Sequence, residues 1–126
     1  MKIIIADDNK AFSEALSIYV ETELGHQVIS VHNNGLELIS DPKIDEANLI
    51  LTDIEMPKLN GIEAIKKLNI NTHNFSVIAI TNHYEKVYQK DLVTNGFKGC
   101  VYKDKIYNTL NDAINLVMDG KLYFNY

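Results

Sequence analysis

Short apolar runs recur along the chain, and polar or turn-forming residues follow each of them. Five runs are predicted to be strands, at 2–6, 27–31, 48–52, 76–80 and 99–102. All but 27–31 are nearly continuous in apolar residues, without regular alternation with polar ones. Runs of this kind are typical of strands that are buried on both faces of a sheet.

The segments between these runs carry apolar residues at helical spacing. Positions 12–20 and 106–117 place apolar side chains three and four residues apart, which predicts two half-buried helices. Gly25 stands where the first of these helices is expected to end. Weaker helical patterns fill the remaining gaps at 35–40, 61–68 and 85–95. The chain is therefore expected to alternate five strands with five helices.

This alternation predicts an α/β fold with a parallel sheet that is covered on both faces. Right-handed crossovers leave few topologies, and among them the doubly wound order 2-1-3-4-5 places the first and third strands side by side. Ligands of such folds bind beyond the carboxyl ends of the strands at that point. Asp7, Asp8 and Asp53 follow or end those two strands, so we expect them to meet there.

Composition limits the classes of protein to which the chain can belong. Its 126 residues, 46% of them hydrophobic, suit one domain, which we place at 1–120 with 121–126 as a tail or the start of a linker. A net charge of -5 argues against direct binding to nucleic acid or to an anionic membrane. The single cysteine, the absence of a signal peptide and the lack of membrane-length apolar runs favour a cytoplasmic protein.

Three carboxylates at neighbouring strand ends would repel one another unless they share a cation. Magnesium or manganese, which take oxygen ligands, would suit them. Taken singly, each acid has a structural explanation, because Asp8 or Asn9 could cap the following helix and an aspartate often only makes a turn. Their joint placement favours the metal site.

Two other strand ends carry a hydroxyl group and an amine. Thr81 follows the fourth predicted strand and Lys103 follows the fifth. Together with a cation and a positioned carboxylate, these groups could transfer a phosphoryl group to an aspartate. Alternatively, Thr81 is an ordinary strand-end hydroxyl and Lys103 a solvated charge at the edge of the sheet.

These residues resemble the receiver domain of two-component response regulators, from residue 2 to about residue 120. The motifs that carry the resemblance are Ile4-Ile5-Ala6-Asp7-Asp8-Asn9, Leu51-Thr52-Asp53-Ile54-Glu55-Met56-Pro57 with Gly61, Ala79-Ile80-Thr81, and Tyr102-Lys103. The resemblance implies that Asp53 accepts phosphate from a histidine kinase. It also implies that Asp8 and Asp53 ligate the metal directly, Asp7 through water and Glu55 through its main-chain carbonyl group.

The same resemblance implies a flavodoxin-like signalling domain without a turnover substrate, in which Thr81 and Lys103 stabilise the phosphoryl group. Met56-Pro57 is expected to form a rigid turn, and Gly61 to permit a tight backbone.

One departure from the family pattern concerns the switch region formed by Thr81 and Cys100. Receivers usually carry Tyr or Phe where this chain has Cys100, which we expect to be a small buried hydrophobic residue. Tyr102 or Tyr84 could substitute for the aromatic ring, with Tyr102 expected on the opposite face of the strand from Cys100. Asn82 could narrow the phosphoryl site.

The lifetime of the phosphorylated state in the family depends on the positions occupied here by Glu55 and His83. We predict slow to intermediate dephosphorylation, because the carboxylate of Glu55 repels rather than orients the attacking water.

A finer resemblance is to receivers of LuxR-type transcription regulators. The segment Gly96-Phe97-Lys98-Gly99-Cys100-Val101-Tyr102-Lys103 is similar to their Gly-Phe-Lys-Gly-Tyr-x-x-Lys. A DNA-binding output domain follows in that class, so this chain is expected to be either an excised receiver or a stand-alone regulator, and its apolar tail favours excision. A homodimer through the first and fifth helices is a further implication of the resemblance.

Three other functions compete with this interpretation. A haloacid-dehalogenase-type phosphatase would need Asp-x-Asp after the first strand, whereas this chain has adjacent Asp7 and Asp8. A flavodoxin-like flavin binder would need a phosphate-binding loop there. A degenerate receiver that serves only for docking is disfavoured by the complete set of acidic, hydroxyl and lysine positions, although Cys100 leaves it open.

Overall fold

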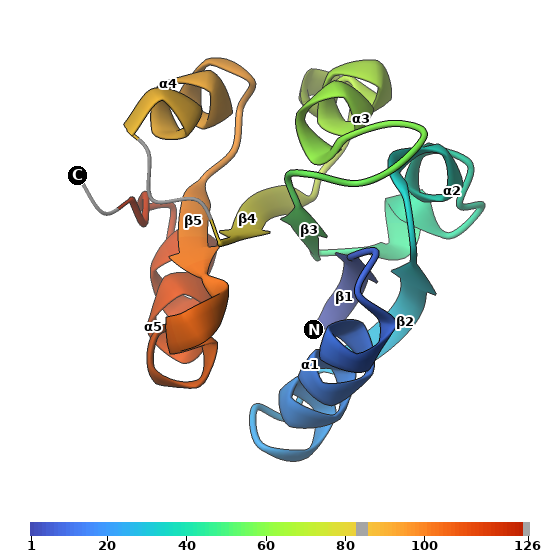
Figure 1. Ribbon diagram of the computed structural model, residues 1–126. Helices are drawn as coiled ribbons and strands as arrows, with labels where there is room; N and C mark the ends of the chain where they lie inside the picture. The colour runs from blue at the N-terminus through green and yellow to red at the C-terminus, as the bar shows by residue number, and fades with distance from the viewer. Residues whose placement is uncertain (83–85, 125–126) are drawn as a thin grey trace.

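The computed structural model describes residues 1–82 and 86–124 (Figure 1). The strands are β1 Lys2–Ala6, β2 Gln27–His32, β3 Leu49–Asp53, β4 Ser76–Thr81 and β5 Gly99–Tyr102. The helices are α1 Lys10–Thr22, α2 Gly35–Ile39, α3 Gly61–Leu68, α4 Lys86–Thr94 and α5 Ile106–Met118. Three single turns of 3-10 helix, which the sequence pattern did not predict, lie at Ile44–Glu46, Ile70–Thr72 and Lys103–Lys105.

The five strands form one parallel sheet in the order β2-β1-β3-β4-β5. This is the doubly wound, flavodoxin-like topology that the sequence predicts. In the register of β1 against β3, Ala6 lies beside Thr52. The residues that follow them, Asp7 and Asp53, therefore meet at one edge of the sheet. The topology thus brings the segment after β1 and the end of β3 to the same place.

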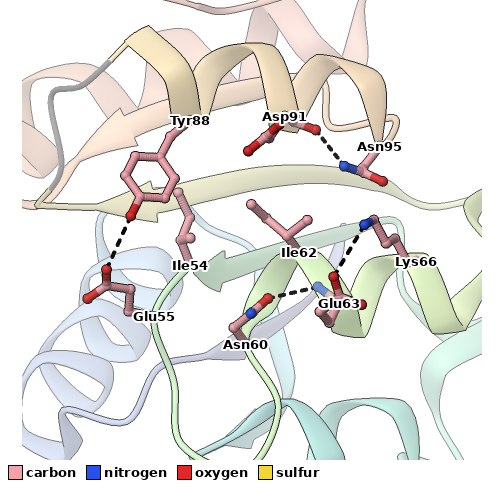
Figure 2. Close-up of a pocket in the computed structure, with 9 residues that line it drawn as sticks. All are labelled: Ile54, Glu55, Asn60, Ile62, Glu63, Lys66, Tyr88, Asp91 and Asn95. Carbon is pink, nitrogen blue, oxygen red and sulfur yellow. Dashed lines mark hydrogen bonds and ion pairs between the residues drawn. The ribbon is translucent and has the colours of Figure 1, made fainter.

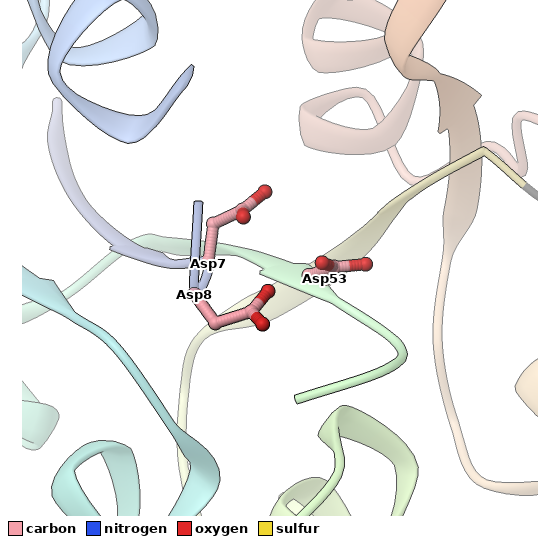
Figure 3. A group of neighbouring side chains, drawn as sticks. All are labelled: Asp7, Asp8 and Asp53. Atoms are coloured by element: carbon pink, nitrogen blue, oxygen red, sulfur yellow. The ribbon is translucent and has the colours of Figure 1, made fainter. Parts of the chain in front are cut away.

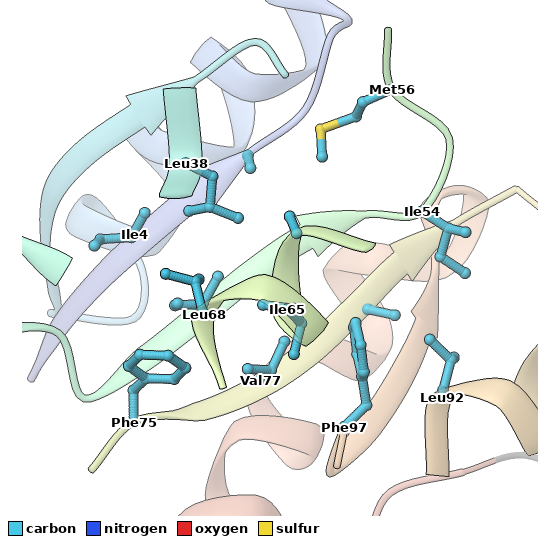
Figure 4. Packing of buried hydrophobic residues seen from close by; sticks show 14 of the residues in the cluster. Ile4, Leu38, Ile54, Met56, Ile65, Leu68, Phe75, Val77, Leu92 and Phe97 are labelled. Atoms are coloured by element: carbon cyan, nitrogen blue, oxygen red, sulfur yellow. The ribbon is translucent and has the colours of Figure 1, made fainter. Parts of the chain in front are cut away.

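The helices cover both faces of the sheet, α1 and α5 on one and α2, α3 and α4 on the other (Figure 1). Successive strand residues alternate between the two cores. The core under α1 and α5 includes Ile3, Leu51, Ile80, Leu110 and Ile114. The core under the other three helices includes Ile4, Leu38, Ile65, Val77 and Leu92 (Figure 4). Burial on both sides explains why the strand sequences are continuous apolar runs.

Asparagine caps the helices that begin near the acidic edge of the sheet. The side chain of Asn9 accepts a hydrogen bond from the backbone N–H of Phe12 at the start of α1, and Asn34 and Asn60 cap α2 and α3 in the same way. Such a cap contributes about 1 kcal/mol to stability. Because Asn9 caps α1, the carboxylate of Asp8 is not needed for that purpose.

The described part of the tail packs against the domain. The backbone N–H of Cys100 donates to the carbonyl oxygen of Tyr123 (2.8 Å), and that of Tyr123 donates to Lys98 (2.9 Å). Tyr123 therefore forms a parallel bridge with Gly99 at the open edge of β5. Pairing of this kind protects a strand edge from other chains.

The longest helices, α1 and α5, have 13 residues each. Within the two described ranges, no helix has the length and apolar content needed to cross a membrane.

Candidate functional site

Three carboxylates meet where β1 and β3 end, as the sequence predicts (Figure 3). Asp7 and Asp8 follow β1 directly, and Asp53 is the last residue of β3. One oxygen atom from each side chain lies within 4.8 Å of the others. Asp7 and Asp53 are buried, whereas Asp8 is exposed, so the cluster opens to solvent on one side.

Backbone hydrogen bonds hold the two buried carboxylates in place. Oδ1 of Asp7 accepts from the backbone N–H of Asn9 at 2.8 Å, which is the turn role considered for this residue. Oδ1 of Asp53 accepts from the backbone N–H of Ile54 at 2.8 Å. Each carboxylate thus directs its other oxygen, Oδ2, toward Lys103.

Lys103 lies between the buried acids rather than in solvent. Its Nζ is 2.7 Å from Oδ2 of Asp7 and 3.2 Å from Oδ2 of Asp53, and its side chain is 13% exposed. Burial opposes the charge of the ammonium group, but the close contact with the carboxylate of Asp7 and the nearby charge of Asp53 outweigh it, so the pKa of Lys103 is raised. The solvated edge charge considered as an alternative is therefore wrong for this residue.

Asp53 carries an unfavourable charge. Burial and the neighbouring carboxylate of Asp7 raise its pKa from 3.8 to about 6, even though Lys103 and the Ile54 N–H act in the opposite direction. One lysine does not neutralise two buried acids and an adjacent third. A further cation at this edge would relieve the repulsion.

The donor set suits a hard divalent cation. The clustered side chains, Asp7, Asp8 and Asp53, offer only carboxylate oxygens, which magnesium and manganese prefer over softer metals. Exposure of Asp8 leaves a route of entry from solvent and room for the waters that magnesium usually retains. The residues present therefore fit such an ion.

Thr81 and Glu55 lie at the border of this cluster. Thr81 ends β4, is 1% exposed and pairs in register with Tyr102, while the preceding residue, Ile80, pairs with Asp53. Glu55 is exposed two residues after Asp53, and its Oε1 accepts a hydrogen bond from the hydroxyl of Tyr88 at 3.4 Å. Asn82 is exposed; His83 and Tyr84, singled out from the sequence, lie outside the described residues.

The loop after Asp53 turns back tightly, as expected from its proline and glycine. Gly61 donates its N–H to the carbonyl oxygen of Ile54 at 2.8 Å, and a Cβ atom at Gly61 would clash with the carbonyl oxygen of Asp53. Lys58, which follows Pro57, adopts a left-handed conformation with φ of 67°. Only glycine allows this close approach of α3 to the end of β3.

The prediction for Tyr102 was wrong. Cys100 and Tyr102 both point into the core under α4, because strand alternation separates adjacent residues and returns residues two apart to the same face. Tyr102 is 6% exposed, and its hydroxyl accepts a hydrogen bond from Nε2 of Gln89 on α4 at 2.8 Å. Burial raises the pKa of the Cys100 thiol to about 12, so this residue behaves as the inert hydrophobic residue expected.

A pocket of about 370 Å³ lies between α3 and α4, beside the carboxylate cluster rather than around it (Figure 2). Its polar residues largely bind one another. Lys66 contacts Glu63 at 3.2 Å, and Tyr88 reaches Glu55. Asp7, Asp8 and Asp53 do not line it, so we place the chemistry at the strand ends and not in this hollow.

Sequence reasoning missed two side chains that contact site residues. Phe12 was counted only as an apolar position of a helix, but its ring lies under the ammonium group of Lys103. Gln89 was not singled out, although it binds Tyr102. An aromatic residue in the first turn of the helix that follows the acidic pair could have indicated Phe12. Nothing in the linear pattern indicates Gln89.

A comparison with protein families decides the class of this site. The family model of the response regulator receiver domain matches residues 3–115. The chain belongs to the response regulator receiver family. It is thus a signalling domain of two-component systems, and receiver domains bind Mg²⁺ at an acidic pocket such as the one formed by Asp7, Asp8 and Asp53.

The relatives of this receiver domain include transcription regulators. It is 28% identical to the virulence transcription regulator BvgA of Bordetella pertussis, over 98% of this chain and 58% of the relative. It is also 28% identical to the transcriptional regulatory protein YdfI of Bacillus subtilis, over 96% of this chain and 56% of the relative. The receiver domain therefore spans little more than half the length of these curated relatives.

Solved structures show the same fold. The non-phosphorylated receiver domain of the stress response regulator RcsB from Escherichia coli has a TM-score of 0.87 at 22% identity, covering 100% of this chain and 98% of that one. A LuxR-family DNA-binding response regulator from Staphylococcus aureus has a TM-score of 0.82 at 24% identity, covering 90% of this chain and 95% of that one.

Proposed function

We propose that this receiver domain accepts a phosphoryl group from a histidine kinase on Asp53. The observation that carries the proposal is the position of Lys103, whose Nζ contacts the carboxylates of both Asp7 and Asp53 at the end of the central strand. An ammonium group there lies next to the oxygen that would attack phosphorus. It can neutralise the charge that develops on the transferred group.

The transfer breaks the phosphorus–nitrogen bond of a phosphohistidine and forms a bond between phosphorus and a carboxylate oxygen of Asp53, while the imidazole takes up a proton. In this reaction Thr81 donates a hydrogen bond to a phosphoryl oxygen and Lys103 contacts another. Asp53 is 7% exposed, so its surroundings limit the water that competes with the donor.

Asp8 and Asp53 would hold Mg²⁺ or Mn²⁺ directly, Asp7 through water and Glu55 through its main-chain carbonyl group. When bound, the cation neutralises charge on the phosphoryl oxygens. Burial and the repulsion from Asp7 raise the pKa of Asp53, and a cation that would relieve this repulsion supports the assignment.

The proposed product is a signal and not a released compound, so no turnover substrate is expected. We place the output in a DNA-binding domain that follows this receiver in the complete regulator, and a homodimer as one consequence of phosphorylation. The link between Tyr102 on β5 and Gln89 on α4 supports a route by which a change near Lys103 reaches the α4 face.

Intact-mass measurement after incubation with magnesium and a small acyl phosphate tests the acceptor. The wild-type chain is expected to gain the mass of one phosphoryl group, and Asp53→Asn to gain none. Asp45→Asn, which changes an exposed aspartate, is the matched control and should behave as wild type. A gain that persists in Asp53→Asn would contradict the assignment of Asp53, and no gain with several donors would favour a docking module.

The lifetime of the phosphorylated state tests the proposed effect of Glu55. We expect the wild-type phosphoryl group to be lost slowly and Glu55→Gln to lose it several-fold faster, because an amide can orient the water that a carboxylate repels. The loss is followed by intact mass after the donor is removed. A wild-type half-life of seconds would contradict this expectation.

A further inference from the structure

The ammonium group of Lys103 is held from two directions. On one side are the carboxylates of Asp7 and Asp53, and on the other the ring of Phe12, whose centroid lies 4.7 Å from Nζ. A cation within about 6 Å of an aromatic centroid is attracted to the negative face of the ring. With a side chain only 13% exposed, Lys103 meets little competition from water for this contact.

The position of the ring follows from the way in which α1 begins. The backbone N–H of Phe12 donates to the side chain of Asn9 at 3.1 Å, and the N–H of Asn9 donates to Oδ1 of Asp7 at 2.8 Å. The ring itself packs against the core under α1 and α5. A ring of successive contacts therefore surrounds the acidic edge, and it runs through Asp7, Asn9, Phe12 and Lys103.

We propose that Phe12 is a positioning residue, which keeps the ammonium group of Lys103 at the acceptor through the face of its ring. This inference rests on the proposed phosphorylation of Asp53. During that reaction both carboxylate partners of Lys103 change, because Asp53 is modified and Asp7 is proposed to bind the metal-bound water. The ring takes part in neither event, so it is the contact that holds Nζ in place throughout.

Graded fluorination of this ring tests the proposal. Site-specific replacement of Phe12 by mono-, di- and trifluorophenylalanine withdraws electron density from the ring face while almost preserving its shape. The rate of phosphorylation by a small acyl phosphate with magnesium, followed by intact mass, should fall stepwise, by about threefold to tenfold for the trifluoro ring. The rate of phosphorylation of Phe12→Leu should fall by a similar factor, and that of Phe12→Tyr should equal the wild-type rate.

Tyr19→Leu is the matched control for loss of an aromatic ring from α1. Tyr19 packs edge to face on Tyr107 with centroids 4.7 Å apart, away from the ammonium group. Its rate of phosphorylation should equal that of wild type. The free energy of unfolding of each variant is measured alongside the rate. If Phe12 only supported the fold, its replacement would lower the free energy of unfolding, and fluorination of the ring would leave the rate unchanged.

A constant rate across the fluorinated series, with phosphate gained normally at Asp53, would overturn the role of Phe12 and leave the proposed function intact. Failure of the wild-type chain to gain phosphate would overturn both. A stepwise fall at unchanged stability is the result that supports the positioning role.

Discussion

Asp41 and Asp53 are both buried and both have a basic partner, but their pKa values shift in opposite directions. At Asp41, beyond the end of β2, Oδ2 lies 2.7 Å from Nε2 of His32. Burial alone would raise the pKa of Asp41, but hydrogen bonds from His32, from the backbone of Lys43 and from Ser30 outweigh it, and the pKa is lowered. At Asp53 the same competition ends in the other direction, with a pKa of about 6.

Besides burial, which is the largest influence on the pKa of both residues, the two sites differ in how many acids share the available donors. Asp41 accepts hydrogen bonds from His32, Lys43 and Ser30. Asp53 instead shares one lysine with Asp7 and lies beside Asp8. Asp41 is thus a structural carboxylate that stabilises the fold. The fold keeps a destabilising charge at Asp53, which suits the proposed capture of a cation and a phosphoryl group.

The largest change in the free energy of unfolding should come from removing the charge of Asp41, which several hydrogen bonds satisfy. Asp41→Asn is expected to lower the free energy of unfolding at pH 7 by about 2 to 3 kcal/mol, because His32 and the backbone N–H of Lys43 lose a charged acceptor. Since the pKa of Asp41 is lowered, this difference should shrink as the pH falls below about 4. Chemical denaturation at several pH values measures the free energy of unfolding of both chains. An unchanged value for Asp41→Asn would contradict the stabilising role of Asp41.

The opposite change in the free energy of unfolding is expected at Asp53, the proposed acceptor. A pKa raised from 3.8 to about 6 corresponds to about 3 kcal/mol of destabilisation by the ionised form, and we expect Asp53→Asn to recover about 2 of this at pH 7 in the absence of metal. Below pH 3.8 the carboxyl group of residue 53 is protonated in both the folded and the unfolded wild-type chain. The extra stability of Asp53→Asn over wild type should therefore appear as the pH rises from about 4 to 6. A lower free energy of unfolding for Asp53→Asn than for wild type at pH 7 would contradict the claim that the ionised carboxylate of Asp53 destabilises the fold.

A smaller effect should follow from magnesium. At about five times its dissociation constant, the ion should stabilise the wild-type chain by about 1 kcal/mol at pH 7. The apparent affinity should weaken as the pH falls below about 6, because a proton on Asp53 competes with the metal. Calorimetric titration checks this, with Asp45→Asn as a control of normal affinity. Equal affinity at pH 5 and pH 7 would argue against Asp53 as a ligand.

Much of the fold was predictable because it depends on local chemistry. Continuous apolar runs identify strands buried on both faces. Alternation with helices leaves few topologies, and the doubly wound order among them brings Asp7 and Asp53 together. The direction in which the pKa of Asp53 shifts was not predictable, since it depends on how deeply the carboxylate is buried and on where Asp7 and Lys103 lie after folding. The capping residue was left open between Asp8 and Asn9 because both side chains suit that position.

The most direct test of an unfavourable charge at the acceptor is a carboxyl carbon NMR titration of the metal-free chain, with Asp53→Asn and Asp41→Asn identifying the two signals. Asp53 is predicted to titrate near pH 6 and Asp41 below its ordinary value of 3.8. A pKa of Asp53 at or below 3.8 without metal would contradict this explanation of the site.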